Sequence, residues 1–249
     1  MLSELQFRRL VTTGRSVYNV AMTKGILVAG NDSALLNAVE TEVAKRVAQY
    51  ALALIPNRFS VPRENPSYTM SSMSQSKSRV PLDWNPGSAI SARTLVLAAE
   101  NRLGVIDGAI LVCSPPSAPC AAADLKPVDI EVLASDHVKS WLFLTKELAA
   151  GFKARGQGTL ALVYPETDGD VDDGDAVDIF GAMAAASFRS LARRLSAAAS
   201  SEAYVVQGFT GGGAGNEAEF AGFIFRQLDD AKRRVNGKIH KYGKTGFFK

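Results

Sequence analysis

Apolar residues in this chain are grouped in two ways, as short continuous runs and as residues spaced about four apart. The first run covers residues 26–29 and ends at Gly30. Directly after it, apolar residues recur every fourth position from Leu35 to Val47, with charged residues between them. A short apolar run is typical of a buried strand, and the fourfold spacing is typical of an amphipathic helix. The pattern therefore predicts a strand, a tight turn and a helix.

The same alternation continues along the rest of the chain. Further apolar runs of strand length cover residues 51–56, 80–84, 106–112, 159–164 and 203–207. Helical spacing covers residues 88–103, 129–155, 177–199 and 220–235, and a strand-like tail covers 237–248. Because each crossover is long enough to return the chain to the start of the next strand, parallel pairing is favoured. The predicted fold class is α/β: a Rossmann-like doubly wound parallel sheet with helices on both faces, in a three-layer α/β/α sandwich.

One internal segment interrupts this alternation. Residues 57–81 are rich in proline and serine and carry several basic side chains. Such a segment buries too little apolar surface to order itself, which predicts a long excursion or a docking loop. The remainder, residues 22–249, is expected to form a single domain, because a doubly wound sheet often uses this length undivided.

The N-terminal residues 1–21 have a different composition. They contain Arg8, Arg9 and Arg15 together with several hydroxyl residues, and Glu4 is their single acid. This composition is typical of a mitochondrial presequence. The alternative is an N-terminal extension ahead of the first strand. We therefore expect a mitochondrial location, with a cytoplasmic one as the alternative.

Overall composition excludes several classes of protein. A hydrophobic content of 47% with 21% charged residues is ordinary for a globular protein, and a net charge of +3 gives no argument for a nucleic-acid partner. Cys113 and Cys120 have no further Cys or His at ligand spacing, so they are expected to be reduced thiols. No apolar stretch reaches the roughly 18 residues that a transmembrane helix needs.

Two loops invite a ligand interpretation that their details weaken. Asp168, Asp170 and Asp172 match the first positions of a calcium-binding loop, but Asp173 replaces its glycine and Ile179 its closing glutamate. A solvated acidic loop is the favoured interpretation.

The glycine-rich residues 211–215 could cradle a phosphate, but no Lys or Ser/Thr follows them as a phosphate loop requires, so a flexible loop is favoured. His240, among several lysines, is expected to belong to a solvated basic tail.

Several local phrases point to a known family. Leu82-Asp83-Trp84-Asn85, Gly104-Val105-Ile106-Asp107, the segment 137–145 and Gly156-Gln157-Gly158 occur in this order along the alternating elements. Their order and spacing resemble the short-chain dehydrogenase/reductase family over residues 24–249. The resemblance implies that Asp83 contacts the adenine of a nicotinamide cofactor. It also implies that His137 occupies the position of a catalytic asparagine, although a histidine on the helix surface is the favoured interpretation.

The chain departs from the family pattern at the residues that bind the cofactor and transfer the proton. In the phosphate-binding turn only Gly30 remains of the glycines, Asp32 places a carboxylate near the phosphates, and Leu36 adds bulk. If a dinucleotide is bound, the resemblance implies Gly30, Asp32, Asp83 and Arg58 as its contacts, with Arg58 facing the 2′-phosphate of NADP.

The proton-transfer residues of the family are also missing. Aligning the family's catalytic helix puts Val177 at the tyrosine position and Gly181 at the lysine position, and a three-residue slip offers Phe180 and Ala184 instead. Tyr164 lies near the position of the catalytic serine, without a lysine at helical spacing. Neither alignment provides a proton donor, which hydride transfer to a carbonyl requires.

Three functions are therefore open. The favoured one is an inactive domain that serves as a structural or accessory subunit of a larger assembly, or as partner of a homologous active reductase, with no cofactor. The second is an NAD- or NADP-dependent oxidoreductase with rearranged catalytic residues. The third is a module that binds a nucleotide without reacting it.

Overall fold

The computed structural model of the 249-residue chain describes residues 25–59, 78–114, 119–165, 178–211, 215–230 and 235–243. The expected presequence at 1–21, most of the excursion at 57–81, most of the acidic loop and Val177 lie outside the described residues.

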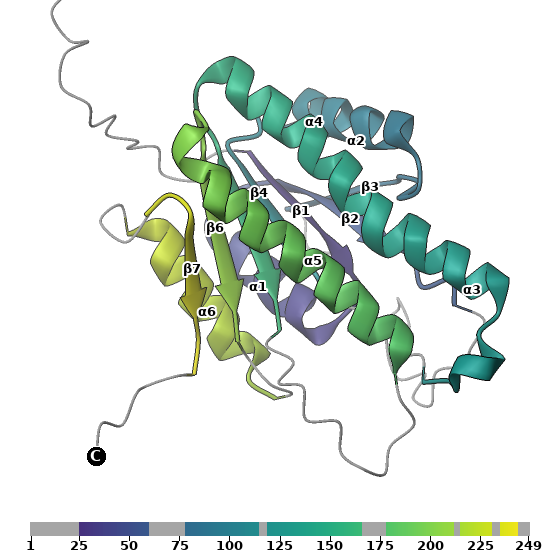
Figure 1. Ribbon diagram of the computed structural model, residues 1–249. Helices are drawn as coiled ribbons and strands as arrows, with labels where there is room; N and C mark the ends of the chain where they lie inside the picture. Colours follow the sequence, from purple (N-terminus) through teal and green to yellow (C-terminus); the bar gives the residue numbers. More distant parts are fainter. Residues whose placement is uncertain are drawn as a thin grey trace, which may run out of the picture.

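A single parallel sheet forms the centre of the molecule (Figure 1). Its strands are β1 (Ile26–Asn31), β2 (Tyr50–Ile55), β3 (Arg79–Leu82), β4 (Gly108–Val112), β5 (Thr159–Tyr164), β6 (Val205–Thr210) and β7 (Lys238–Lys241). They are ordered β3-β2-β1-β4-β5-β6-β7, and each neighbouring pair is parallel. The chain winds outward from β1 to β3, returns to β4 and winds the other way. The predicted doubly wound α/β fold is therefore confirmed.

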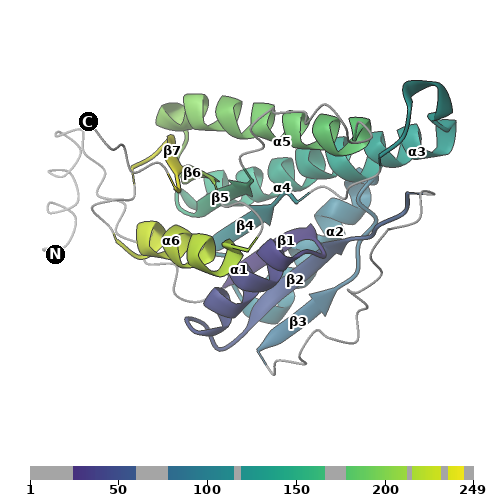
Figure 2. The same cartoon turned by 90° about the horizontal axis from the view of Figure 1, so that it is seen from below.

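Helices cover both faces of the sheet (Figure 2). On one face lie α1 (Ala34–Ala44) and α6 (Glu217–Asp229), and on the other lie α2 (Ala89–Leu103), α4 (Ser140–Arg155) and α5 (Ile179–Ala198). The strands between these layers are apolar on both sides. Leu27 and Ala29 of β1 face the layer of α2, α4 and α5, whereas Ile26 and Val28 face the layer of α1 and α6. Because both faces of these strands are buried, their sequences are continuous apolar runs and do not alternate between apolar and polar residues.

The predicted helix at 129–155 is in fact a succession of three segments. It begins with α3 (Pro127–Val132), continues as the π-helix η3 (Leu133–Lys139) and ends as α4. Apolar spacing does not distinguish a π-helical turn from an α-helical one, so the sequence could not reveal η3. Such turns are frequent at functional sites. The predicted helix at 220–235 also differs, because α6 begins at Glu217 and ends at Asp229.

The prediction that His240 belongs to a solvated basic tail is wrong. His240 lies in β7 and is only 5% exposed, with its ring stacked on Phe209 at 5.2 Å. Its Nε2 lies 3.1 Å from Nε2 of the buried Gln207. Strand alternation turns His240 to the same face as its register partner Phe209, and the exposed lysines around it, Lys238 and Lys241, concealed this burial in the sequence.

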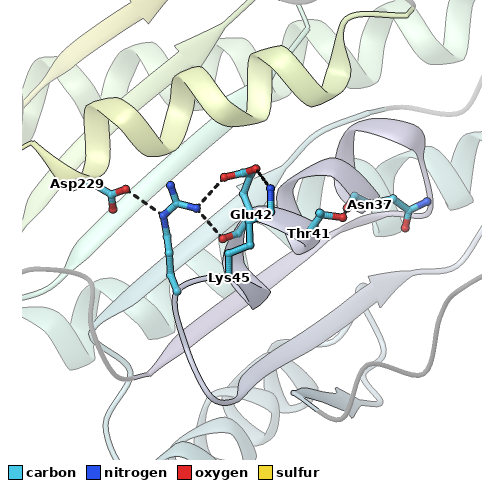
Figure 3. A network of polar contacts seen from close by, with 6 residues as sticks. Asn37, Thr41, Glu42, Lys45 and Asp229 are labelled. Carbon is cyan, nitrogen blue, oxygen red and sulfur yellow. Dashed lines mark hydrogen bonds and ion pairs between the residues drawn. The ribbon is translucent and has the colours of Figure 1, made fainter.

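An arginine joins the two helices of the smaller helical layer. Arg46, directly after α1, donates to Oε2 of Glu42 at 2.7 Å and to Oδ2 of Asp229 in α6 at 2.9 Å (Figure 3). Its guanidinium also lies 4.5 Å from the ring centroid of Phe225. Lys45 donates to the other oxygen of Glu42 but is well exposed.

Arg46→Ala should lower the free energy of unfolding by about 1 kcal/mol, because a partly buried ion pair and a cation–π contact are lost together. Lys45→Ala removes an exposed ion pair with the same glutamate and should change stability by less than about 0.5 kcal/mol. Urea denaturation of both variants measures the difference. Equal effects would show that Arg46 does not couple α1 to α6.

Candidate functional site

The carboxyl ends of β1 and β4 mark the point where the winding direction of the sheet reverses. In doubly wound folds, ligands bind in the crevice beside this point. The residues that the sequence identified are brought to this edge from β1, from the segment after β2, from η3 and from the beginning of α5.

The turn from β1 to α1 contains only Asp32 and Ser33. Ser33 is the N-cap of α1, and its hydroxyl accepts a hydrogen bond from Leu36 N at 3.1 Å. A Cβ atom placed on Gly30 would lie 2.7 Å from the carbonyl oxygen of Val112 and 3.0 Å from Cδ1 of Leu36. Gly30 is thus required by the close approach of β4 and of the Leu36 side chain, which lies over the glycine and is fully buried.

Arg58 and Phe59 run from the end of β2 along this edge to η3, and we call their contacts the edge bridge. Arg58 forms a bidentate ion pair with Asp136 of η3, in which its Nε donates to Oδ2 at 2.7 Å and its Nη2 donates to Oδ1. Asp136 is fully buried, while the Arg58 side chain is 45% exposed. The forked donors of the Arg58 guanidinium are already bound to a carboxylate, so they cannot bind a phosphate while this ion pair is formed.

Phe59 adds an aromatic part to the edge bridge. Its ring stacks on His137 of η3 with centroids 5.5 Å apart and planes at 7°, and it contacts Phe180 of α5 at 5.1 Å. Leu133, Phe180 and Ala184 form a small buried cluster against which Phe59 packs. Phe180 and Ala184 are the positions that the slipped alignment assigned to the family's tyrosine and lysine. Both are apolar and only 2% and 1% exposed.

His137 is buried, and the prediction of a surface histidine is wrong. Its side chain is 0% exposed, and neither ring nitrogen has a hydrogen-bond partner among the described residues. Burial lowers the pKa of His137 to about 4, an effect that Asp136 opposes and Arg58 reinforces. The π-helical turn and the stacking of Phe59 direct the ring inward, neither of which follows from helical spacing in the sequence.

Tyr164 and Gly181 are the other described positions that the sequence assigned to the family's catalytic residues. Tyr164, at the end of β5, is 4% exposed and meets Phe188 edge-on at 6.1 Å. The backbone N–H of Gly181 donates to Oδ1 of the N-cap Asp178 at 2.8 Å, and a Cβ at Gly181 would lie 2.2 Å from Oδ2 of Asp178. A lysine at position 181 would therefore clash with the cap of α5.

Among the described residues, no hydrogen bond or ion pair joins Asp83 or Asp32 to the edge bridge. Asp83, which the resemblance assigned to adenine, is exposed after β3. Its neighbour Trp84 donates from Nε1 to the carbonyl oxygen of Leu54 at 2.9 Å and so fixes this segment to β2. Asp32 is half-buried and its charge contributes to a raised pKa of Glu40, whose main cause is burial.

Comparison with solved structures identifies the architecture. A short-chain dehydrogenase/reductase from Burkholderia xenovorans superposes with a TM-score of 0.67 at 14% identity, covering 88% of this chain and 95% of that one. The fold is that of the short-chain dehydrogenases/reductases. A short-chain dehydrogenase from Mycobacterium smegmatis gives a TM-score of 0.65 at 11% identity, covering 90% of this chain and 94% of that one.

A third neighbour was solved with a cofactor. The NADH-dependent reductase A1-R′, complexed with NAD, gives a TM-score of 0.63 at 16% identity and covers 88% of this chain and 94% of that one. No protein-family model and no curated protein sequence matches the chain. The similarity therefore lies in the fold, and what this chain does has to be argued from its own residues.

No described helix is long and apolar enough to cross a membrane. The described residues also contain no group of three or more His, Cys, Asp or Glu side chains able to hold a metal ion.

Proposed function

We propose that this protein is an inactive domain with the short-chain dehydrogenase/reductase fold, serving as a structural or accessory subunit of a larger assembly or as partner of an active reductase. The observation that carries the proposal is the edge bridge, in which Phe59 packs on His137 and Phe180 beside the switch point of the sheet. These three side chains would have to move apart before a substrate could enter a site at this position.

The absence of a proton donor at the tyrosine and lysine positions of both alignments supports inactivity. Hydride transfer to a carbonyl needs an acid at the oxygen, and such catalysis contributes on the order of 10²–10⁴ in rate. Gly181 takes the lysine position in the first alignment, and Phe180 takes the tyrosine position in the slipped one. Neither residue provides a phenol or a cation. Tyr164 packs against Phe188 and lies on a different element from any of the substituted positions.

The residues of the β1–α1 turn fit a dinucleotide poorly. In dinucleotide-binding folds the pyrophosphate approaches glycine backbone and takes hydrogen bonds from the N-terminus of the first helix. Here Leu36 covers Gly30, and the hydroxyl of Ser33 already accepts the N–H of Leu36. The carboxylate of Asp32 in the same turn would repel a phosphate.

A hollow between α4 and α5 supports a role in assembly. It has a volume of about 450 Å³ and is lined mainly by apolar side chains. Leu142 lines it and is 51% exposed, and Met183 on α5 is 55% exposed. Domains of the family that this chain resembles commonly pair through the corresponding helices. A mitochondrial location is part of the proposal and rests on the composition of residues 1–21 alone.

Titration with NAD⁺, NADH, NADP⁺ and NADPH should show no saturable binding up to millimolar concentration. The reason is that Leu36 covers the β1–α1 turn where the phosphates would bind, and Phe59 packs on Phe180 beside the switch point. Isothermal calorimetry measures binding, and absorbance of the reduced cofactor measures turnover with a panel of carbonyl compounds.

The three functions predict different outcomes. Absence of binding agrees with the accessory role. Binding without turnover would replace it with a nucleotide-holding module, and turnover of any carbonyl would overturn it. Isolation of the native protein then identifies any second chain that remains bound in stoichiometric amount through gel filtration.

One observation favours the alternative of an NAD(P)-dependent oxidoreductase. The reductase solved with NAD shares the fold over nearly its whole length, and Gly30 keeps the close backbone approach at the end of β1. On that alternative Arg58 would have to exchange Asp136 for a 2′-phosphate, and Phe59 would have to leave His137 and Phe180.

A further inference from the structure

A second hollow lies at the carboxyl ends of the last three strands, beneath α5. It has a volume of about 220 Å³ and is lined by Tyr164, Arg189, Arg193, Thr210, Ile239 and Lys241. Three of these residues are the last of their strands, and the pairing register places Tyr164 opposite Thr210 and Thr210 opposite Lys241. Register partners in a parallel sheet point to the same face, so the three side chains stand in a row.

Helix α5 supplies the other wall of this pocket. Figure 1 shows α5 lying over the sheet on the side of β5 and β6, and α5 also contacts β7. Arg189 and Arg193 are four residues apart and therefore project on the same side of the helix, one turn from each other. The Phe188 ring next to Arg189 packs against Tyr164 and fixes the rotation of α5 at this point.

The lining is chemically one-sided. It contains two guanidinium groups, one ammonium group and two hydroxyls, and no carboxylate is among the lining side chains. Guanidinium groups present forked donors that match the oxygens of phosphate or carboxylate, and a concave site strengthens the field of its charges. The chemistry therefore favours an anion with several oxygens.

Two of the lining groups lack a partner that would account for their position. Thr210 is 4% exposed, and its hydroxyl has no hydrogen-bond partner in the described part of the chain. Arg193 has neither an ion pair nor a hydrogen bond with any described residue. An oxyanion in the hollow can accept a hydrogen bond from the Thr210 hydroxyl and pair with the Arg193 guanidinium.

We propose that this pocket binds a small multivalent oxyanion, a phosphate group or a di- or tricarboxylate, through Arg193, Arg189 and Lys241 with the hydroxyls of Thr210 and Tyr164. The proposal is independent of dinucleotide binding, because no residue of the β1–α1 turn or of the edge bridge takes part. Arg189, Lys241 and Tyr164 also interact elsewhere in the chain, so the anion joins or replaces those contacts.

Inorganic phosphate and citrate are the two probes, titrated at constant ionic strength with chloride as the reference anion and followed by calorimetry or by amide chemical shifts. We expect saturable binding of at least one of them with a stoichiometry of one. Arg193→Gln should weaken it about tenfold, since one charge-assisted hydrogen bond of about 1.4 kcal/mol corresponds to that factor. Thr210→Val, which keeps the shape of the side chain, should weaken it in the same direction.

Arg194→Gln is the matched control, because Arg194 is exposed on α5 and lines the neighbouring hollows but not this pocket. Unchanged affinity in this variant supports the proposal, and preference for phosphate or for citrate names the ligand class. Two outcomes overturn it: no saturable binding of either probe, or an equal loss in Arg194→Gln and Arg193→Gln, which would place the anion on the outer surface of α5.

Discussion

Arg58→Ala should lower the free energy of unfolding by about 3 kcal/mol, because it leaves the carboxylate of Asp136 buried without its guanidinium. Removing one member of a buried ion pair costs more than the pair contributes, since the remaining charge stays in a medium that solvates it poorly. The Arg58 side chain is 45% exposed, so water compensates part of the loss and places the effect at the lower end of the range for buried pairs. Urea denaturation measures the change.

The double variant Arg58→Ala with Asp136→Asn tests whether the unpaired carboxylate causes the loss of stability. It removes both charges and should be more stable than Arg58→Ala alone, because an amide costs less to bury than an unpaired carboxylate. Arg102→Ala, at an exposed position in the last turn of α2, controls for the loss of an arginine. If Arg58→Ala left stability unchanged but weakened NADP binding, the 2′-phosphate role of Arg58 would be correct and the edge bridge incidental.

The sequence predicted the fold well because the fold follows from local patterns. Apolar runs such as 26–29 and the fourfold spacing after them are properties of consecutive residues, and the buried sheet requires them. The tight turn after Gly30 is likewise predicted by the place of this glycine at the end of the first apolar run. The boundaries of helices depend on caps such as Asp178 for α5 and are less visible, which explains the shifted ends of α6.

The candidate sites followed less completely. The edge bridge joins Arg58 to Asp136, two residues 78 positions apart, and no spacing rule relates them. The available signal was compositional: an arginine followed by a phenylalanine after the second strand, and an aspartate followed by a histidine ahead of α4. The oxyanion pocket was missed although Tyr164 had been singled out, because Thr210 and Lys241 become its neighbours only through the strand order of the sheet.

The structural role of His137 can be tested through the pH dependence of stability, because the ring is buried in the folded chain. The ring is 0% exposed and its neutral form is the one that the fold accommodates, because burial lowers the pKa to about 4 from an ordinary 6.5. Protonation therefore favours the unfolded chain. Above pH 6.5 both states hold a neutral ring and stability is independent of this residue, whereas stability falls as the pH drops from 6.5 toward 4.

His137→Phe should remove this part of the pH dependence. Between pH 7.5 and pH 4.5 the wild-type chain should lose roughly 2–3 kcal/mol more unfolding free energy than the variant, as follows from a pKa of about 4 in the folded state. At pH 7.5 the variant should be as stable as the wild type or more stable, because phenylalanine keeps the stacking on Phe59 and eliminates two ring nitrogens without described partners. Denaturant titrations at both pH values measure the difference, and His240, whose pKa burial also lowers to about 4, remains unchanged in the comparison. A parallel pH profile for the two proteins would mean that His137 is protonated or solvated in the folded chain, and its place in a filled, inactive site would then be wrong.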